Sequence, residues 1–495
     1  MERLNYTTLK KAGYDGYVLE NAPEKVLQFG EGGFLRAFVD YFFDLANEKH
    51  GFNGKVVLVQ PIAQGLTNMI NEQEGLYTLY LRGFQDGKTV NDKRVISCVS
   101  RCINPYEDYV AFLSCAHNPE LRYVASNTTE AGIAYDPACR FSDVPPASFP
   151  AKLTRFLYER YIEFGNQPGK GLIILSCELI DNNGQELKKC VMQYIDQWQL
   201  SDEFRAWVEK ENLFCSSLVD RIVTGYPRGE ADRLNEENGY IDNLIDTGEV
   251  FGAWVIEGPE WLAEELPFCK GDMPVIVTPD HKPYKQRKVR ILNGAHTTMV
   301  LGAYLAGQDI VRDCMQDEVI SAYMDKVLYD EIIPTLTLPK EELTAFAASV
   351  RERFANPFID HLLLSISLNS VSKWRARCMP SLKAYMEKMN AVPACLSLGL
   401  ASLLAFYHGE RMEGTALIGK RAKGNEYEIH DDAAVLAFFL AHKDAAPAEY
   451  VHAALANEAF WGENLTQLPG LEAKVLKHYE TILHDGAYAA MKNVL

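Results

Sequence analysis

Three features of the sequence predict an α/β protein of two domains. A short apolar strand, a glycine turn and an amphipathic helix follow one another near the N-terminus. Short apolar runs with polar turns after them continue to residue 278, as expected for a parallel sheet. From Lys285 onward, long amphipathic segments replace the strand signals. We therefore expect an elaborated Rossmann-type α/β domain over residues 1–285 and a mainly α-helical domain over residues 286–495.

The first strand and helix have the pattern of a nucleotide-binding unit. The strand, Lys25–Phe29, is short, and the helix after it has apolar residues at positions 35, 38, 39, 42, 43 and 46, the spacing of one buried stripe. Gly30 and Gly32 lie between them, where glycines allow a tight turn and a close approach to a pyrophosphate. Leu35 stands at the position of the usual third glycine, so an ordinary turn is the alternative.

Polar turns follow several of the next strands. Strands are expected over residues 55–60, 94–99, 121–126 and 171–177. Ligands collect at the carboxyl ends of parallel strands, which makes binding candidates of the segments 127–132 and 178–184, with plain connecting loops as the alternative. The 55–60 strand ends in Gln60 rather than in an acid for the adenosine ribose, and no arginine for a 2′-phosphate follows it directly. The choice between NAD and NADP therefore stays open, leaning to NAD.

The rest of the N-terminal half adds one charged pair and two strands. Asp220 and Arg221 are adjacent within an apolar run, for which a structural ion pair is the ordinary interpretation. Strand character returns over residues 251–257 and 274–278.

One segment of the C-terminal half carries chemically capable side chains on a predicted buried helix. Lys288, Asn293 and His296 lie among dense apolar residues from Ile291 onward. Asn293 and His296 are three residues apart and neighbour each other on an α-helix, whereas Lys288 is about a turn and a half away and reaches them only through its long side chain. A lysine at a helix start in partly dry surroundings is suited to take up and release a proton. A solvated basic helix entry followed by a core histidine is the alternative.

Composition excludes several classes of partner. The net charge of −18 argues against a nucleic acid or an anionic membrane surface, although a local pocket can still accept an anionic substrate. The N-terminus lacks the apolar core of a signal peptide, and the longest apolar run, 394–407, is too short to span a bilayer. The eleven cysteines have no zinc-site spacing, so no metal is expected and the reducing cytoplasm is the expected compartment. The sequence does not indicate an oligomeric state.

The spacing Lys288-x4-Asn293-x2-His296 resembles the signature of the polyol-specific long-chain dehydrogenases, the mannitol dehydrogenase family. Further similarities span most of residues 24–383; they are Gly30-x-Gly32-x-Phe34-x-Arg36, Thr129-Glu130, Ser176-Cys177, Val219–Ile222, Trp254–Glu257, Arg353-Phe-x-Asn356-Pro357 and Ser372-Lys373.

The resemblance implies that residues 1–285 form an NAD-binding domain and that residues 286–495 form the substrate and catalytic domain. Lys288 is expected to act as general acid and base, Asn293 to donate its amide to the carbonyl oxygen and His296 to position a substrate hydroxyl. The implied substrate-binding residues are Asp220 and Lys373, with Glu178 and Asn183 as further candidates at a strand end. The implied cofactor-binding residues are Gly30, Gly32, Gly33, Phe34, Arg36, Gln60, Thr129 and Glu130. The cofactor is expected to be NAD, with NADP as the alternative.

Departures from the family pattern concern the substrate. Leu179 stands where mannitol-type members carry an asparagine, for which Asn182 or Asn183 is the candidate replacement, and Ser365 stands where they carry an arginine. These changes argue against mannitol or fructose and are compatible with a different, acidic substrate, a sugar acid to whose carboxylate Lys373 could offer charge. In the glycine turn, Leu35 and Phe38 replace histidines common in the family. The alternatives are another polyol dehydrogenase of the family and a dinucleotide-binding regulator without turnover.

Overall fold

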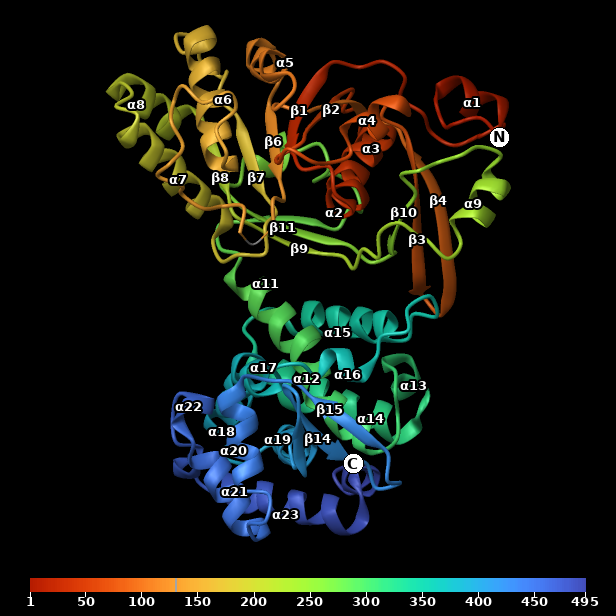
Figure 1. Ribbon diagram of the computed structural model, residues 1–495, viewed down its shortest axis with the longest axis vertical. Coiled ribbons are helices and arrows are strands. Elements are labelled where there is room, and N and C mark those ends of the chain that lie inside the picture. The colour runs from red at the N-terminus through yellow and green to blue at the C-terminus, as the bar shows by residue number, and fades with distance from the viewer. Residues whose placement is uncertain (130) are drawn as a thin grey trace. The chain divides into compact units, whose positions relative to one another are not determined.

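The computed structural model describes residues 1–129 and 131–495, which divide into two compact units. Unit 1 comprises Met1–Arg82 and Val90–His281, and unit 2 comprises Gly83–Thr89 and Lys282–Leu495. Unit 1 holds a parallel sheet with helices on its faces, and unit 2 is mainly helical (Figure 1). The predicted fold class is confirmed.

The central sheet of unit 1 has six parallel strands in the order β5-β2-β1-β6-β7-β8. Its strands are β1 (Glu24–Phe29), β2 (Lys55–Val59), β5 (Val99–Ile103), β6 (Tyr123–Ser126), β7 (Ile173–Ser176) and β8 (Leu213–Cys215). Counted within this sheet the order is 3-2-1-4-5-6, that of a doubly wound nucleotide-binding sheet. Such a sheet has its topological switch point between the first and fourth strands, which here are β1 and β6.

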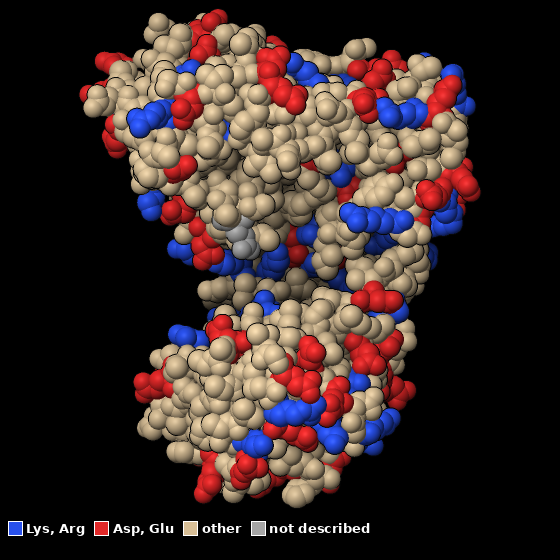
Figure 2. Space-filling model, in the orientation of Figure 1, with Lys and Arg blue, Asp and Glu red and all other residues tan. Residues whose placement is uncertain are grey.

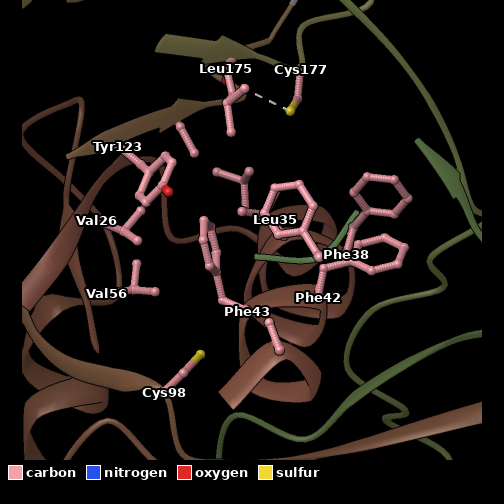
Figure 3. Close-up of a cluster of buried hydrophobic side chains, with 14 of the residues drawn as sticks. Val26, Leu35, Phe38, Phe42, Phe43, Val56, Cys98, Tyr123, Leu175 and Cys177 are labelled. Carbon is pink, nitrogen blue, oxygen red and sulfur yellow. Dashed lines mark hydrogen bonds between the residues drawn. The ribbon is translucent and has the colours of Figure 1, made fainter. Parts of the chain in front are cut away.

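Successive residues of β1 face opposite sides of the sheet and enter two different cores. Val26 packs with α2 (Gly33–Ala37) and α3 (Val39–His50), as the close-up of this core shows (Figure 3). Leu27 and Phe29 pack on the other side, with α6 (Phe149–Phe164) and α7 (Asn183–Gln197). The predicted apolar stripe from position 35 to position 46 is buried, each of its six side chains being at most 1% exposed. The predicted single helix is instead two helices, because the chain bends at Phe38 (φ −123°, ψ −72°).

Two small sheets extend unit 1. One has the order β10-β3-β4 and the other β12-β11-β9. Their strands are β3 (Tyr77–Gln85), β4 (Lys88–Ile96), β9 (Ser217–Asp220), β10 (Asp246–Glu249), β11 (Ala253–Glu257) and β12 (Val275–Thr278). The expected single strand over 94–99 is wrong: the apolar run is the end of β4, a corner, and the start of β5. Apolar periodicity cannot locate that corner, because both sides of it are buried.

The remaining helices of unit 1 are short, apart from α8. They are α1 (Tyr6–Lys11), α4 (Thr67–Glu72), α5 (Tyr109–Ser114), α8 (Asp202–Glu211), α9 (Ala231–Asn238) and α10 (Leu262–Glu265).

Unit 2 is built around two buried helices, α12 (Gly294–Leu305) and α19 (Ala394–Phe406). The helices around them are α11 (Lys282–Arg287), α13 (Val311–Gln316), α14 (Glu318–Lys326), α15 (Lys340–Phe354), α16 (Leu363–Ile366), α17 (Ser370–Arg377), α18 (Met379–Met389), α20 (Ala433–Ala441), α21 (Pro447–Ala456), α22 (Glu458–Trp461), α23 (Leu471–Asp485) and α24 (Ala487–Lys492). The sequence did not indicate the antiparallel sheet β13 (Arg411–Glu413), β14 (Ala416–Lys420) and β15 (Glu426–Ile429), whose strands are short and rich in charged residues.

Small residues let α12 and α19 pack closely. A Cβ atom on Gly399 would lie 2.7 Å from the Thr298 Cγ2 atom, and one on Gly302 would lie 2.9 Å from the Ser402 Oγ atom. The N-terminal end of α19 is held by buried Glu331, whose two carboxylate oxygens accept hydrogen bonds of 2.7 Å from the backbone amides of residues 395 and 396. The helix that carries His296 is therefore fixed on a rigid support.

Surface charge, helix length and the grouping of metal-ligating side chains are three further features of the described residues. Acidic and basic side chains are intermixed over the visible face of each unit (Figure 2). Among the described residues, no helix is both long and apolar enough to cross a membrane. Within the same residues, no three His, Cys, Asp or Glu side chains converge as ligands of a metal ion would.

Candidate active site

The glycine turn after β1 lies at the switch point of the sheet. β1 pairs in parallel with β6 up to Phe29 and Ser126, so the turns that follow both strands start side by side. Gly30 has a φ of +122°, a conformation that favours glycine, and a Cβ atom there would lie 2.7 Å from the Leu35 Cδ1 atom and 3.2 Å from the Asn127 carbonyl oxygen. Leu35 thus fills the space beside Gly30, which explains how the turn accommodates the residue that replaces the usual third glycine.

The next two glycines differ in their surroundings. No heavy atom lies within 4 Å of a Cβ placed on Gly32, among the described residues, so its backbone is open to a ligand. A Cβ on Gly33 would meet both carboxylate oxygens of Asp246 at 3.2 Å. The Phe34 ring is half-buried and stacks on Phe38, with 5.1 Å between centroids. Gly32 is therefore the position of this turn that best suits the close approach of a pyrophosphate.

Arg36 supports the turn from inside the protein. Its side chain is buried and donates to the Glu31 carbonyl oxygen (3.1 Å) and to the Leu244 carbonyl oxygen (2.6 Å). It also forms an ion pair of 3.5 Å with Asp246. These contacts point to a structural contribution, and direct contact of Arg36 with a cofactor stays a prediction.

The turns after β2 and β6 contain the other predicted cofactor residues. Gln60 is buried; it donates to the Ile62 carbonyl oxygen and accepts from the Thr67 hydroxyl, both at 2.8 Å, so it shapes the loop that follows β2. Thr129 has a φ of +73°, unusual for a residue with a branched side chain. Glu130 lies outside the described residues.

Glu178 and Asn183 bind other parts of unit 1. The buried Glu178 carboxylate accepts from the Ser126 hydroxyl (3.1 Å) and from the amide and hydroxyl of Thr128 (3.0 Å each). Burial raises the pKa of Glu178, and these hydrogen bonds oppose the increase. Asn183 is also buried; its side chain donates to the carbonyls of residues 178 and 217 and accepts from the amides of residues 184 and 217. Both side chains thus hold neighbouring strand ends together through hydrogen bonds. Contact of Glu178 or Asn183 with a substrate stays a prediction.

The remaining unit 1 candidates lie at strand ends. Asp220 ends β9 and is 7% exposed, whereas Leu179, at the position of the missing asparagine, is 64% exposed. The adjacent Arg221 donates to the carbonyl oxygens of residues 37 and 251, and burial lowers its pKa to about 10.

Lys288 and Asn293 begin and end a π-helical turn, η2 (Lys288–Asn293), which joins α11 and α12 into one continuous helical run. Hydrogen bonds in a π-helix link residue i to residue i+5, so residues five apart lie on the same side of the helix, about one turn apart. On an α-helix the same two residues would point about 140° apart. The π-helical turn therefore brings Lys288 to the side of the helix that carries Asn293, closer than the sequence indicated.

The helix extends further towards the N-terminus than the predicted stretch, which began at Lys285. The helical run begins with α11 at Lys282, so Lys288 lies beyond its first turn. The positive potential of a helix end fades within one turn and does not act on Lys288.

His296 lies among aromatic rings and cations. Its ring stacks on Phe354 of α15, with 3.8 Å between centroids and 3° between planes, and meets the His361 ring edge-on at 5.5 Å. Burial lowers the pKa of His296 well below its ordinary value, and His361, Arg353 and Arg377 lower it further. The ring is therefore neutral at physiological pH. The Nε2 atom is buried and has no hydrogen-bond partner within the described part of the chain, so it is available to a substrate hydroxyl.

The lowered pKa of His296 predicts a pH effect on stability. Below pH 6.5 the unfolded chain binds a proton at this histidine that the folded chain does not, so the free energy of unfolding decreases as the pH falls. Between about pH 8 and pH 5.5, we expect the free energy of unfolding of the wild type to decrease more than that of His296→Gln. Denaturant unfolding of both proteins at the two pH values measures the difference. Equal losses in the two proteins would show that His296 is protonated normally in the folded state.

Helix α17 brings two cations towards the same region. Lys373 donates to the Ile366 carbonyl oxygen at 2.9 Å, and burial and the charge of Arg377 lower its pKa. Arg377 donates to the Thr297 hydroxyl at 3.4 Å, and burial lowers its pKa. Because Thr297 follows His296 directly, Arg377 lies at the helix that carries the predicted catalytic residues.

Sequence reasoning missed three of these residues. Arg377 follows Lys373 by four positions, so helical spacing alone places the two on one face and provided a signal. Phe354 belongs to the Arg353-Phe-x-Asn356-Pro357 segment that resembles the family, but nothing in the sequence indicated that Phe354 or His361, both distant along the chain, lies against His296.

The two units differ in the chemistry that their residues offer. Unit 1 has the open glycine turn at the switch point that dinucleotide-binding sheets use, and unit 2 has a lysine, an asparagine and a neutral histidine on one helical run, the side-chain types that suit proton transfer at a carbonyl group. The class of protein is thus a Rossmann-type oxidoreductase. Residues 24–270 match the mannitol dehydrogenase Rossmann domain, and residues 280–483 match the mannitol dehydrogenase C-terminal domain. The chain belongs to the mannitol dehydrogenase family.

Individual relatives cover nearly the whole chain. An altronate oxidoreductase of Pectobacterium atrosepticum is 47% identical over 493 residues, which are 98% of this chain and 99% of that protein. An altronate oxidoreductase of Klebsiella pneumoniae is 47% identical over 95% of this chain and 96% of its own.

Two solved structures have the same fold at low identity. A substrate-free D-sorbitol dehydrogenase has a TM-score of 0.78 at 21% identity, covering 99% of this chain and 100% of its own. Mannitol 2-dehydrogenase of Pseudomonas fluorescens, in a ternary complex with NAD and D-mannitol, has a TM-score of 0.66 at 22% identity and covers 99% of both chains.

Proposed function

We propose that this protein is an NAD-dependent reductase that interconverts D-tagaturonate and D-altronate by hydride transfer, in the breakdown of hexuronates such as galacturonate. The observation that carries the substrate class is the position of Arg377, which, with Lys373 on the same helix, adds positive charge near His296. A guanidinium binds a carboxylate through two parallel hydrogen bonds, and a neutral polyol has no group that matches it. The relatives named altronate oxidoreductase support the particular sugar acid. Similarity to tagaturonate reductases in segments 176–184 and 356–373 supports it as well.

In this proposal, Lys288 is the general acid in the direction of reduction. Its ammonium group gives a proton to the oxygen of the former carbonyl, and in the reverse direction the amine removes the proton from the altronate hydroxyl. Asn293 donates its amide to the same oxygen and stabilises the developing negative charge. His296 is neutral and orients a neighbouring hydroxyl through Nε2, the atom that has no partner within the described part of the chain. NAD, when bound, accepts the hydride, and NADH supplies it.

The residues of unit 1 suit the cofactor. The open backbone at Gly32 and the left-handed Gly30 fit a pyrophosphate, and both lie at the switch point where such sheets bind dinucleotides. Gly33, Phe34, Gln60 and Thr129 lie in or next to the turns that would surround it.

The alternatives to this proposal are two other enzymes of the family and one protein without catalytic activity. Fructuronate reductase and mannitol-type polyol dehydrogenase share the family and the mechanism, and they differ in the sugar that unit 2 must recognise. A dinucleotide-binding regulator without turnover has no need of the Lys288-Asn293-His296 arrangement.

NADH oxidation by the purified protein tests the substrate. We expect turnover with tagaturonate to exceed that with fructuronate and fructose, because Arg377 favours an acid and the relatives favour this one. Preference for fructuronate would keep the acid and change the stereochemistry, preference for fructose would remove the role of Arg377, and NADH binding without turnover would favour the regulator.

We also place this enzyme in the cytoplasm, acting on a small sugar acid and not on nucleic acids or membranes. All eleven cysteines are free thiols, which supports a reducing compartment.

A further inference from the structure

The second strand of the nucleotide-binding sheet lacks the acid that usually holds the adenosine ribose. Gln60 follows β2 at that position, and its amide is occupied by the Ile62 carbonyl and the Thr67 hydroxyl. An acid at this place is what ordinarily favours NAD, because it accepts hydrogen bonds from the ribose hydroxyls and repels a 2′-phosphate. If the protein uses NAD, another group must supply that charge.

A carboxylate reaches the end of β2 from the glycine turn. Glu31 lies between Gly30 and Gly32, and its side chain extends to the loop after β2. The Oε1 atom lies only 2.2 Å from the position that a Cβ atom of Gly65 would occupy, and the Gln60 side-chain amide lies 2.6 Å from the same point. The absence of a side chain at Gly65 therefore leaves room for the carboxylate of Glu31 beside Gln60.

The surroundings of Glu31 hold the carboxylate in place. The residue is 8% exposed, so its charge is only partly screened by water. Burial raises the pKa of Glu31, whereas hydrogen bonds with the backbone at residues 31 and 66 and the charge of Arg36 favour the ionised form. Without these contacts, the carboxylate of a loop residue would be free to turn into the solvent.

We propose that Glu31 is the residue that selects NAD over NADP. Its carboxylate enters from the glycine turn and takes the place of the missing acid at the end of β2. There it accepts a hydrogen bond from the adenosine ribose hydroxyls of NAD, and it repels the 2′-phosphate of NADP. The proposal rests on the proposed NAD dependence and names the group that causes it.

The test compares the wild type with Glu31→Gln, which keeps the shape of the side chain and removes its charge. Binding of NADH and of NADPH to the full-length protein is titrated by nucleotide fluorescence, without any sugar. We expect the wild type to prefer NADH and the variant to lose at least about tenfold of that preference, mainly through tighter NADPH binding. The matched control is Glu120→Gln, which removes the same charge from an exposed residue just before β6, at the opposite edge of the sheet.

Glu31→Asp is a second variant, in which the shorter side chain withdraws the carboxylate from Gly65 without removing it. An intermediate preference would agree with the proposal and would show that a variant with native charge still folds and binds. An unchanged preference in both variants, or a wild type that binds NADPH as tightly as NADH, would overturn it. Because no sugar is present, the result is independent of whether tagaturonate is the substrate.

Discussion

Replacing Lys288 by alanine is expected to lower kcat for the NADH-dependent reduction of tagaturonate by about 10²–10⁴-fold, the usual contribution of one general acid or base. The π-helical turn places Lys288 on the side of Asn293, where its ammonium can reach the same oxygen as the Asn293 amide. Steady-state NADH oxidation measures the loss. Titration of NADH should give an unchanged dissociation constant, because the nucleotide-binding turns belong to unit 1.

Two further measurements make the result specific. Lys340→Ala removes an exposed lysine at the start of α15 in the same unit and should leave kcat unchanged. A small primary amine added to the Lys288 variant should restore part of the lost rate, which a merely misfolded protein would not show. Near-normal turnover of Lys288→Ala would remove the lysine from the mechanism.

Replacing Arg377 by glutamine is expected to lower kcat/KM for the keto-sugar acid by about 10²-fold, because a half-buried carboxylate would lose a charged, two-pronged partner. The loss should lie mainly in KM. Arg377→Lys should recover part of it, since an ammonium keeps the charge and loses the planar fork. Lys373→Met should have a smaller effect, because the Lys373 ammonium already donates to the Ile366 carbonyl oxygen.

Substrate comparison separates carboxylate binding from a structural role. The neutral ketose fructose has no carboxylate, so its residual kcat/KM should change little in Arg377→Gln. Arg375→Gln, on the same helix but exposed, is the matched control and should behave as the wild type. Equal losses with acidic and neutral ketoses would show that Arg377 supports α12 through Thr297 rather than binding the substrate.

Several parts of the molecule follow from local sequence patterns. The glycines at 30 and 32 between an apolar strand and an apolar stripe predicted the nucleotide-binding turn, because turn conformation and helix periodicity depend on neighbouring residues. The spacing of Lys288, Asn293 and His296 predicted one helical segment with polar residues for the same reason. The prediction of one strand over 94–99 was wrong, because the apolar residues on the two sides of the corner are all buried and their sequence pattern is that of a single strand.

The sequence by itself determined the fold class, the position of the nucleotide-binding turn and the helix that carries the lysine, since each depends on contacts within a few residues. Only the tertiary structure decided that a π-helical turn aligns Lys288 with Asn293, and that Phe354, His361 and Arg377 surround His296. It also decided that the Glu31 carboxylate lies at the end of β2. These arrangements depend on packing between segments that are distant along the chain, and the free energy of such packing leaves no period or spacing in the sequence.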